Sequence, residues 1–309
     1  MVDFHTHSNI SDGDLPPAEL IHEAVRQGLS AIALTDHDTI EGFESARNAV
    51  KSLTNDKKIH FIPGIEINIS WTSKNKSIRL GPGGEFHLLG LGINSPSPAF
   101  TDAVWRLSNH RKARNREILN RMYELSVITN KEAAWKELLA LAGRSAGTER
   151  QKSGYSLGRP HFANYLIKHK FAKNQNQAFD RYLGVGRPLY VPKRGLKFEE
   201  AVGLIRESGG IPILAHPFSL FIAWGRLVDF IKNLKDMGLA GIEAWHPVAR
   251  AGSCHRLEAL GRSLGLYVTE GSDFHGASHP ERKLGFSSKS RKINDNILEA
   301  IPELMSFSN

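Results

Sequence analysis

Short apolar runs and longer amphipathic stretches alternate along the chain, and this pattern predicts strands and helices in alternation. Residues 31–34 form an uninterrupted apolar run. The stretch before it, from Pro17 to Gln27, carries apolar side chains at helical spacing until Gly28 ends it. A short apolar run after such a helix is typical of a buried parallel strand. The pattern therefore predicts an α/β fold.

Other predicted strands follow the same pattern, and each carries or ends in a histidine or an acidic residue. They cover residues 59–66, 86–91, 211–217, 241–247 and 266–270. In barrels of alternating strands and helices, the active site lies at the rim where the strands end. We expect the polar residues of these segments to gather at one such rim.

Two histidines, His5 and His7, stand two positions apart near the amino terminus on a predicted strand. Side chains alternate faces along a strand, so both imidazoles point to one side while Val2 and Phe4 fit the other. Imidazole suits zinc, iron and manganese, and a carboxylate can bridge two cations. Alone, a pair of this kind is more often part of a partly exposed strand than of a metal site.

Further segments rich in histidine and carboxylate strengthen the prediction of a metal site. Asp12 follows the first pair, residues 35–38 read Thr-Asp-His-Asp just after a predicted strand, and residues 271–276 read Gly-Ser-Asp-Phe-His-Gly. Mixed histidine and carboxylate ligands favour a cluster of first-row metal ions. The sequence therefore predicts a site that holds more than one metal ion.

These residues carry a resemblance to a known family. The chain resembles the PHP (polymerase and histidinol phosphatase) phosphoesterase superfamily over residues 1 to about 95 and about 190 to 286. Its four motifs match His5-x-His7, Thr35-Asp36-His37, Ala215-His216-Pro217 and Ser272-Asp273-Phe274-His275. The resemblance implies a distorted (β/α)7 barrel, with residues 1–96 as its first part and residues 191–309 as its second.

The resemblance also implies a site for three divalent metal ions, which could be manganese, zinc or iron. By motif position, the three ligand sets would be His5, His7, Glu66 and Asp273; Glu66, His87 and His216; and Asp12, His37 and His275. Glu66 would bridge two of the ions, and Asp36 would orient a ligand imidazole. A hydroxide between two cations would attack phosphorus in line, without a covalent enzyme intermediate.

The other histidines divide into two kinds. His246, in the setting Trp-His-Pro at a predicted strand end, is expected to contact the substrate phosphate or the leaving group, with a structural role as the alternative. The histidines that lack a partner pattern are expected to be ordinary surface or core residues: His22, His60, His110, His169, His255 and His279.

Residues 97–190 differ from the rest of the chain in charge and in pattern. They hold seventeen Lys and Arg against seven Asp and Glu, a net charge of +10, while residues 1–96 carry −4 and residues 191–309 carry +2. From Trp105 to Ser126 the apolar positions recur at helical spacing among arginines and lysines. We expect an inserted all-helical domain that attracts phosphate groups or a nucleic-acid backbone.

Arg159-Pro160-His161 is the most informative segment of this insertion. An arginine fork matches phosphate, and Pro160 can begin a helix whose amino terminus adds positive potential. The segment resembles the branch of the superfamily that contains nucleoside 3′,5′-bisphosphate phosphatases and the 5′-to-3′ exonuclease ribonuclease AM. The resemblance implies that Arg159 and His161 bind phosphate, with Lys193 and Arg194 as helpers.

A second segment, from Trp71 to Gly84, reads as an exposed loop that contains three basic residues and ends in glycines. A loop that cradles phosphate is the alternative, although nothing like a helix amino terminus follows it.

The single cysteine, Cys254, excludes an intrachain disulfide. With no charged and apolar leader and no long apolar run, the sequence predicts a cytoplasmic protein without a membrane segment or an obligate protein partner.

Together these patterns predict a phosphoric ester hydrolase that acts on nucleotide 3′,5′-bisphosphates or trims short RNA from its 5′ end. Histidinol-phosphate phosphatase is an alternative, against which the basic insertion argues. A nucleic-acid-binding module with a purely structural metal site is another, although every expected ligand position holds a competent residue. The chain carries no Gly-x-Ser-x-Gly elbow and no Gly-x-x-x-x-Gly-Lys loop, so serine hydrolase and nucleoside-triphosphatase chemistry find no support.

Overall fold

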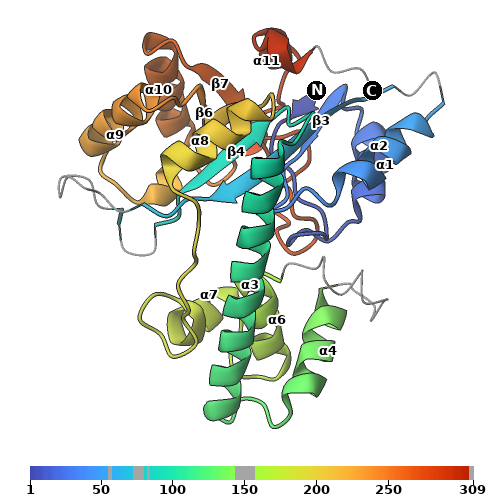
Figure 1. Cartoon of the computed structure of the whole chain (residues 1–309), viewed down its shortest axis with the longest axis vertical. Coiled ribbons are helices and arrows are strands. Elements are labelled where there is room, and N and C mark those ends of the chain that lie inside the picture. Colours follow the sequence, from blue (N-terminus) through green and yellow to red (C-terminus); the bar gives the residue numbers. More distant parts are fainter. Residues whose placement is uncertain (55–57, 72–79, 82–83, 143–156, 306–309) are drawn as a thin grey trace.

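The strands of the chain form a nearly closed barrel, and a group of helices extends from one side of it (Figure 1). The structure is a computed structural model that describes residues 1–54, 58–71, 80–81, 84–142 and 157–305. Within these residues one sheet has the strand order β1 to β7. The strands are β1 (Val2–Asp3), β2 (Ala31–Leu34), β3 (His60–Asn68), β4 (His87–Leu91), β5 (Ile211–Leu214), β6 (Gly241–Trp245) and β7 (Tyr267–Glu270).

The first and last segments of the sheet come together and bring the barrel close to closure. Thr6, which follows β1, pairs in parallel with Phe274, which follows β7. The backbone N–H of His7 donates to the carbonyl of Phe274 across 2.9 Å. The two ends of the chain's motif pattern are therefore neighbours in space, and the predicted α/β barrel is confirmed.

One strand, β4, runs in the opposite direction to the others. β1, β2 and β3 run parallel, as do β5, β6 and β7, whereas β4 is antiparallel to both of its neighbours. His87 at the start of β4 lies opposite Asn68 at the end of β3. Because β4 runs in the opposite direction, its first residue reaches the rim that the other strands reach with their last.

Helices cover the outer face of the barrel, since their apolar stripes pack on the outward side chains of the strands. In α1, for example, Leu20, Ile21 and Ala24 are buried in one cluster with Ile32 of β2 and Ile65 of β3. The helices around the barrel are α1 (Pro17–Arg26), α2 (Phe43–Lys51), α8 (Phe198–Glu207), α9 (Trp224–Asp236), α10 (Ala251–Ser263) and α11 (Asn296–Glu299).

A second apolar cluster fills the inside of the barrel. Phe4, Ala33, Ile62 and Leu89 alternate along the strands with the outward-facing residues, and all are buried. The carboxyl-terminal segment, including Leu304, packs against the same cluster. A packed interior of this kind gives a rigid base for side chains at the rim.

The described part of residues 97–190 is helical and contains no strand. Its elements are α3 (Pro98–Glu124), α4 (Lys131–Leu141), α6 (Arg159–Lys168), α7 (Gln175–Ala178) and a π-helical turn (Phe179–Leu183). α3 begins earlier than the pattern predicts, because Ser97 caps it by accepting from the N–H of Phe100 across 3.1 Å and Pro98 fits the first turn.

The helical segment has an apolar cluster of its own. Ile118 of α3, Leu138 of α4 and Phe162 of α6 are fully buried within it, whereas Phe100 and Leu107 in the first half of α3 belong to the apolar cluster around the barrel. Figure 1 shows α3 running from the barrel to the far end of this helical group. Residues 143–156, and most of the loop expected from Trp71 to Gly84, lie outside the described residues, and the described helices include none long and apolar enough to cross a bilayer.

Candidate active site

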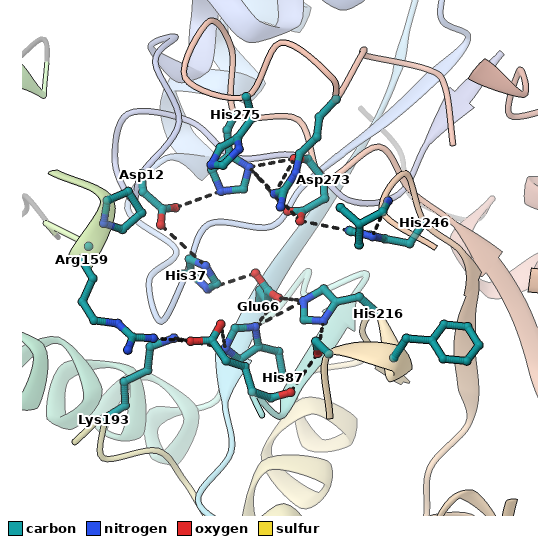
Figure 2. Close-up of a pocket in the computed structure, with 18 of the residues that line it drawn as sticks. Asp12, His37, Glu66, His87, Arg159, Lys193, His216, His246, Asp273 and His275 are labelled. Carbon is teal, nitrogen blue, oxygen red and sulfur yellow. Dashed lines mark hydrogen bonds and ion pairs between the residues drawn. The ribbon is translucent and has the colours of Figure 1, made fainter. Parts of the chain in front are cut away.

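Residues far apart in the sequence converge at one rim of the barrel and form what we call the rim cluster (Figure 2). Each comes from a strand or from the loop that follows one, with His87 brought there by the reversed direction of β4. The rim cluster consists of the nine residues predicted as metal ligands: His5, His7, Asp12, His37, Glu66, His87, His216, Asp273 and His275.

The first predicted ligand set is held around the Nε2 atoms of His5 and His7, which lie 3.1 Å apart. Oε2 of Glu66 is 3.4 Å from Nε2 of His5 and 3.2 Å from Nε2 of His7. Oδ1 of Asp273 is 3.4 and 3.2 Å from the same two atoms. Two imidazole nitrogens and two carboxylate oxygens therefore face one point, which is a donor set suited to a first-row metal ion.

The second predicted set uses the other oxygen of Glu66. Oε1 is 2.7 Å from Nδ1 of His87 and 2.8 Å from Nε2 of His216. The two imidazole nitrogens are 3.3 Å apart. Because its two oxygens face different groups of imidazoles, Glu66 has the geometry of a carboxylate that bridges two cations.

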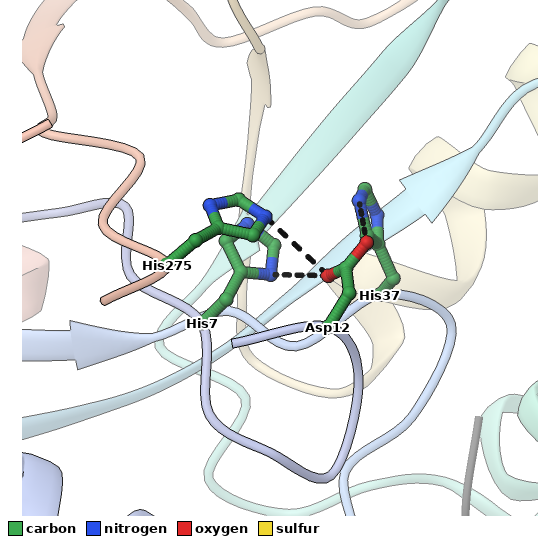
Figure 3. A group of neighbouring side chains, drawn as sticks. All are labelled: His7, Asp12, His37 and His275. Atoms are coloured by element: carbon green, nitrogen blue, oxygen red, sulfur yellow. Dashed lines mark ion pairs between the residues drawn. The ribbon is translucent and has the colours of Figure 1, made fainter. Parts of the chain in front are cut away.

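The third predicted set lies around Asp12 and includes one residue more than the sequence predicts (Figure 3). Oδ2 of Asp12 is 3.8 Å from Nε2 of His37, and Oδ1 is 3.4 Å from Nε2 of His275. Nδ1 of His7 is also 3.8 Å from Oδ1. His7 therefore faces the first set with one ring nitrogen and the third with the other.

Buried polar atoms in the rim cluster are left without hydrogen-bond partners. Within the described residues, these atoms are Oδ1 of Asp12, Nδ1 of His37 and Oε2 of Glu66, the last two of which lie 3.0 Å apart as an ion pair without hydrogen-bond geometry. A buried polar atom is costly unless it is satisfied. Since all three atoms belong to predicted ligands and are nitrogen or carboxylate oxygen, the residues present fit bound divalent cations.

The electrostatics of the rim cluster are strongly coupled. Burial works against the charged carboxylate, yet His37, His87 and His5 hold the pKa of Glu66 well below its usual range. Burial likewise opposes protonation of His5, while Glu243, Asp273 and Glu66 raise its pKa well above the usual value. The carboxylates are thus ionised and ready to act as ligands near neutral pH.

Glu243 is a candidate site residue that the sequence pattern did not single out. It is 1% exposed, its Oε1 is 2.9 Å from Nδ1 of His5, and its Oε2 accepts from the backbone N–H of His216 across 2.7 Å. A carboxylate behind a ligand imidazole fixes the ring and raises its basicity. The available signal was an acidic residue inside an apolar strand, three positions before His246.

Asp36, which is predicted to orient a ligand imidazole, reaches one through a serine hydroxyl. Its carboxylate accepts from the N–H and Oγ of Ser8, at 2.8 and 2.6 Å, and from Oγ of Ser11 at 2.6 Å. Oγ of Ser11 is in turn 3.3 Å from Nδ1 of His7. Within the described residues no imidazole bonds to Asp36, so it reaches a predicted ligand through Ser11 instead of directly.

Two residues of the rim cluster have backbone conformations that side chains disfavour. His216 has φ of 27° and Asp273 has φ of 49°. Both follow strands and turn sharply, and surrounding hydrogen bonds, such as the one that the N–H of His216 donates to Oε2 of Glu243, hold them there. Strain of this kind accumulates where a side chain must point to a particular place.

The rim cluster opens into a cavity of about 700 Å³ between the barrel and the helical segment. Arg159 at the start of α6 and Lys193 line its wall, and both approach Glu85, with the Lys193 Nζ to Glu85 Oε1 distance at 3.0 Å. Figure 2 shows them on the side of Asp12 and His37. Two predicted phosphate-binding residues thus lie beside the rim cluster.

Two other predicted phosphate-binding residues do not line this cavity. Nδ1 of His161 accepts from the N–H of Gly158 across 2.8 Å, because the imidazole caps the first turn of α6. Arg194 is exposed. The sequence predicts that His161 binds phosphate, but in the structure its Nδ1 is engaged in the helix cap.

On the other side of the rim cluster, His246 lines the cavity but is engaged by its neighbours. Its Nε2 is 3.0 Å from Oδ2 of Asp273, and its Nδ1 accepts from the N–H of Val248 across 3.4 Å. Arg282 also bonds to Oδ2 of Asp273, at 2.5 Å. These contacts favour the structural role for His246, in which it orients Asp273.

Other cavity residues were not predicted. His279, expected to be an ordinary histidine, lines the cavity with its ring 5.3 Å from that of His275. Phe221 and Val248 also line it, although they are 65% and 64% exposed. Phe221 has φ of 51°, so the backbone holds this aromatic ring at the cavity mouth in a conformation that side chains rarely adopt.

Comparison with known proteins finds a matching domain family and relatives that cover most of the chain. A model of the PHP domain matches residues 3–207. A 5′-3′ exoribonuclease of Haemophilus influenzae is 32% identical over 273 residues, covering 88% of this chain and 89% of that protein. A 3′,5′-nucleoside bisphosphate phosphatase of Chromobacterium violaceum is 29% identical over 285 residues, covering 92% and 90%.

Solved structures agree with the fold. An amidohydrolase from Chromobacterium violaceum, described with bound sulfate and no metal, has a TM-score of 0.77 at 27% identity and covers 97% of this chain and 96% of that one. A metal-dependent phosphoesterase from Bifidobacterium adolescentis has the same TM-score at 23% identity. The likeness extends over the barrel and the helical segment together.

Proposed function

The chain belongs to the PHP domain family, and from that premise we propose that it is a metal-dependent phosphoesterase that hydrolyses phosphate esters of nucleotides or short RNA. The observation that carries the proposal is Glu66, whose two oxygens face two different groups of imidazoles within 3.4 Å. A buried carboxylate in that position is suited to joining two cations.

We propose three ions, of manganese, zinc or iron, since the mixed nitrogen and oxygen ligands suit each of these metals. Three groups of rim-cluster residues would hold them, around His5 and Asp273, around His87 and His216, and around Asp12 and His37. Such ions act as Lewis acids on phosphoryl oxygens and lower the pKa of a water molecule toward neutrality.

The surrounding residues position the ligands and the substrate. Glu243 orients His5, while His246 and Arg282 hold Asp273 in its ionised form. Arg159 is held by Glu85 and lies with its guanidinium 5.5 Å from the ring of Phe179, so its direction into the cavity is fixed. We propose that its planar fork binds a phosphate oxygen of the substrate.

Nucleotides are the substrate class that the cavity and the relatives support. The relatives include an exoribonuclease and a nucleoside bisphosphate phosphatase, each of which by name acts on nucleotide phosphates. In this chain, Phe221 presents an exposed ring at the cavity mouth, which is suited to stacking a base. A histidinol phosphate has neither a second phosphate nor a nucleobase for these features to bind.

The proposal is tested by comparing turnover of three substrates on one preparation with added manganese: adenosine 3′,5′-bisphosphate, a short 5′-phosphorylated RNA and histidinol phosphate. We expect hydrolysis of one or both of the first two at rates well above that of the third. Faster hydrolysis of histidinol phosphate would support that alternative. Metal-dependent RNA binding with no hydrolysis of any phosphate ester would support the binding module.

A further inference from the structure

The segment that leads from the helices back to the barrel forms one side of a second cavity. We call residues 184–197 the connecting segment, and Figure 1 shows it running from the helical group to α8. The second cavity, which we call the outer cavity, has a volume of about 450 Å³. Its lining includes Asn68 and Ser70 at the end of β3, and Tyr190 and Gly195 of the connecting segment. Cavities of about 300–1,000 Å³ are the common size for ligand sites.

Hydrogen bonds hold the connecting segment in place at both of its ends. The N–H of Leu196 donates to the carbonyl of Asn68 across 3.0 Å. Gly195 lies so close to this strand end that an ideal Cβ on it would be 2.2 Å from the carbonyl oxygen of Asn68, so only glycine fits there. Nearer the helices, Nη1 of Arg121 on α3 donates to the carbonyl of Tyr190 across 2.7 Å. The wall of the outer cavity is therefore fixed by contacts with the barrel and with α3.

The outer cavity adjoins the cavity that opens from the rim cluster. Glu85, Arg159, Val185 and Lys193 line both of them, so the two cavities lie next to each other along these side chains. Val185 is 55% exposed, which places this boundary at the surface of the molecule. A polymer that begins at the rim cluster can therefore continue into the outer cavity, whereas a mononucleotide needs the first cavity alone.

The connecting segment carries positive charge only. It has no acidic residue and four basic ones: Arg187, Lys193, Arg194 and Lys197. Within the described part of the chain, Lys193 is the one of the four that pairs with a carboxylate, that of Glu85. The other three are exposed, so their charges are available to an anionic partner in solution.

Two of these exposed residues flank the aromatic wall of the outer cavity. Arg194 lies between Lys193 and Gly195, which both line the cavity. Arg187 is joined to Tyr190 by a turn, in which the N–H of Tyr190 donates to the carbonyl of Arg187 across 2.9 Å. An aromatic ring between cations is the combination that binds single-stranded nucleic acid, because bases stack on the ring while the backbone follows the charge.

We propose that the outer cavity and the connecting segment bind single-stranded RNA beyond the nucleotide that occupies the cavity at the rim cluster. The inference rests on the proposed function and names the substrate more closely, as an oligonucleotide. Tyr190 stacks a base, and Arg187 and Arg194 contact the backbone of the strand. An acidic protein is another partner that exposed cations attract, but an aromatic cavity that adjoins the site of hydrolysis favours RNA.

The first test measures KM as a function of substrate length. The substrates are adenosine 3′,5′-bisphosphate and 5′-phosphorylated RNA of two, four and eight nucleotides. The metal-loaded enzyme is compared as wild type, as Arg187→Gln/Arg194→Gln and as Lys170→Gln/Lys173→Gln. Lys170 and Lys173 are exposed residues of the same helical segment that line neither cavity, so their variant is the matched control for lost charge.

We expect the wild-type KM to fall as the RNA lengthens. Arg187→Gln/Arg194→Gln should raise KM for the eight-nucleotide RNA by about tenfold and change KM for the bisphosphate by less than about twofold. The dependence of RNA affinity on salt should also become shallower, by about 1.4 in the logarithmic slope, because each phosphate contact on a single strand contributes about 0.7. The lysine variant should match wild type in KM for every substrate.

The second test measures binding without turnover. Fluorescence anisotropy follows a labelled eight-nucleotide RNA with phosphorothioate linkages, which slow hydrolysis. We expect Tyr190→Ala to weaken binding by about fivefold or more, since it removes the ring on which a base stacks. Tyr190→Phe keeps the ring and should bind as wild type does.

Several outcomes would overturn the inference. They are a KM that does not change with RNA length, equal losses on the bisphosphate and on RNA in Arg187→Gln/Arg194→Gln, and the same loss in the lysine control. Hydrolysis of the bisphosphate without any RNA binding would overturn it too and leave the proposed function standing. If no ester is hydrolysed, the proposed function fails, whereas RNA binding that is weakened in the arginine variant and kept in the control still supports the outer cavity.

Discussion

The rim cluster faces the same cavity as four basic residues that we call the cationic wall: Arg111, Arg114, Arg159 and Lys193. The two groups are built in different ways. The rim cluster comes from strand ends of one packed barrel, and its acids and imidazoles balance one another within 4 Å. The cationic wall comes largely from helices with a separate apolar core, and its charges exceed their partners. The barrel is therefore suited to hold the reacting groups in place, whereas the helical segment is suited to select the substrate.

The largest effect is expected from breaking the rim cluster at its centre. Glu66→Ala removes both oxygens that face the imidazoles, so it should lower metal content and abolish measurable turnover, a loss beyond the roughly ten- to a hundredfold typical of an outer partner. Elemental analysis of protein purified without chelator should find more than one metal ion per wild-type chain.

Glu44→Ala is the control for this change, because Glu44 is an exposed glutamate on α2. It should match wild type in metal content and in rate. Full activity in Glu66→Ala would rule out the bridging role and with it the three-ion assignment.

A smaller loss is expected from the outer partner Glu243. Glu243→Gln keeps the shape but removes the charge that raises the pKa of His5, so the imidazole becomes a weaker ligand. Metal affinity, measured by competition with a chelator, should fall about ten- to a hundredfold. Glu299→Gln, at an exposed position, should have no effect. Unchanged affinity in Glu243→Gln would mean that the rim cluster does not depend on this contact.

The cationic wall should respond in a substrate-dependent way. Arg159→Ala should leave metal content intact and lower turnover of adenosine 3′,5′-bisphosphate by about ten- to a hundredfold, since a charged hydrogen bond contributes about 1.5–3 kcal/mol. The effect on p-nitrophenyl phosphate should be smaller. Arg181→Ala, an exposed arginine of the same segment, serves as the control.

Equal losses on both substrates in Arg159→Ala would move Arg159 from the helical segment's selecting role into the chemistry of the rim. No loss on either would remove its phosphate-binding role, and the basic helical segment would then need another acidic partner.

The smallest effect is expected at the cavity mouth. Phe221→Ala removes an exposed ring, and an aromatic contact of this kind is worth about 0.5–1.5 kcal/mol, or a two- to tenfold rise in KM for nucleotides. Trp105→Ala removes an equally exposed ring from α3 that does not line the cavity, so its KM should stay at the wild-type value. The same KM change in both variants would speak against base stacking.

Much of the fold and of the candidate site could be predicted because the informative residues are local to strand ends. His37 lies three positions after the end of β2 and His216 two positions after the end of β5, so predicting the strand also predicts where the imidazole lies. Parallel strands bring their carboxyl ends to one rim, and this rule needs no knowledge of packing. The charge excess of residues 97–190 is likewise a property of composition alone.

Other features were decided only by tertiary structure, because they depend on contacts between residues far apart in the chain. The contact between His5 and Glu243 spans 238 positions, and no local pattern marks which acid lies behind which imidazole. The reversed direction of β4 is set by pairing with both neighbours, and it decides that His87 reaches the rim.

For single basic residues, too, the sequence determined which groups are present and the folded structure decided their roles. From the sequence, His161 and Arg194 looked as suited to phosphate as Arg159 and Lys193, while Arg114 was one arginine among many on a helix. Packing turned His161 into a helix cap, exposed Arg194 and buried Arg114 without a counter-charge. The sequence determined which chemical groups are present and near which strand ends, whereas burial and pairing, which set the free energy of each charge, arose only from the folded structure.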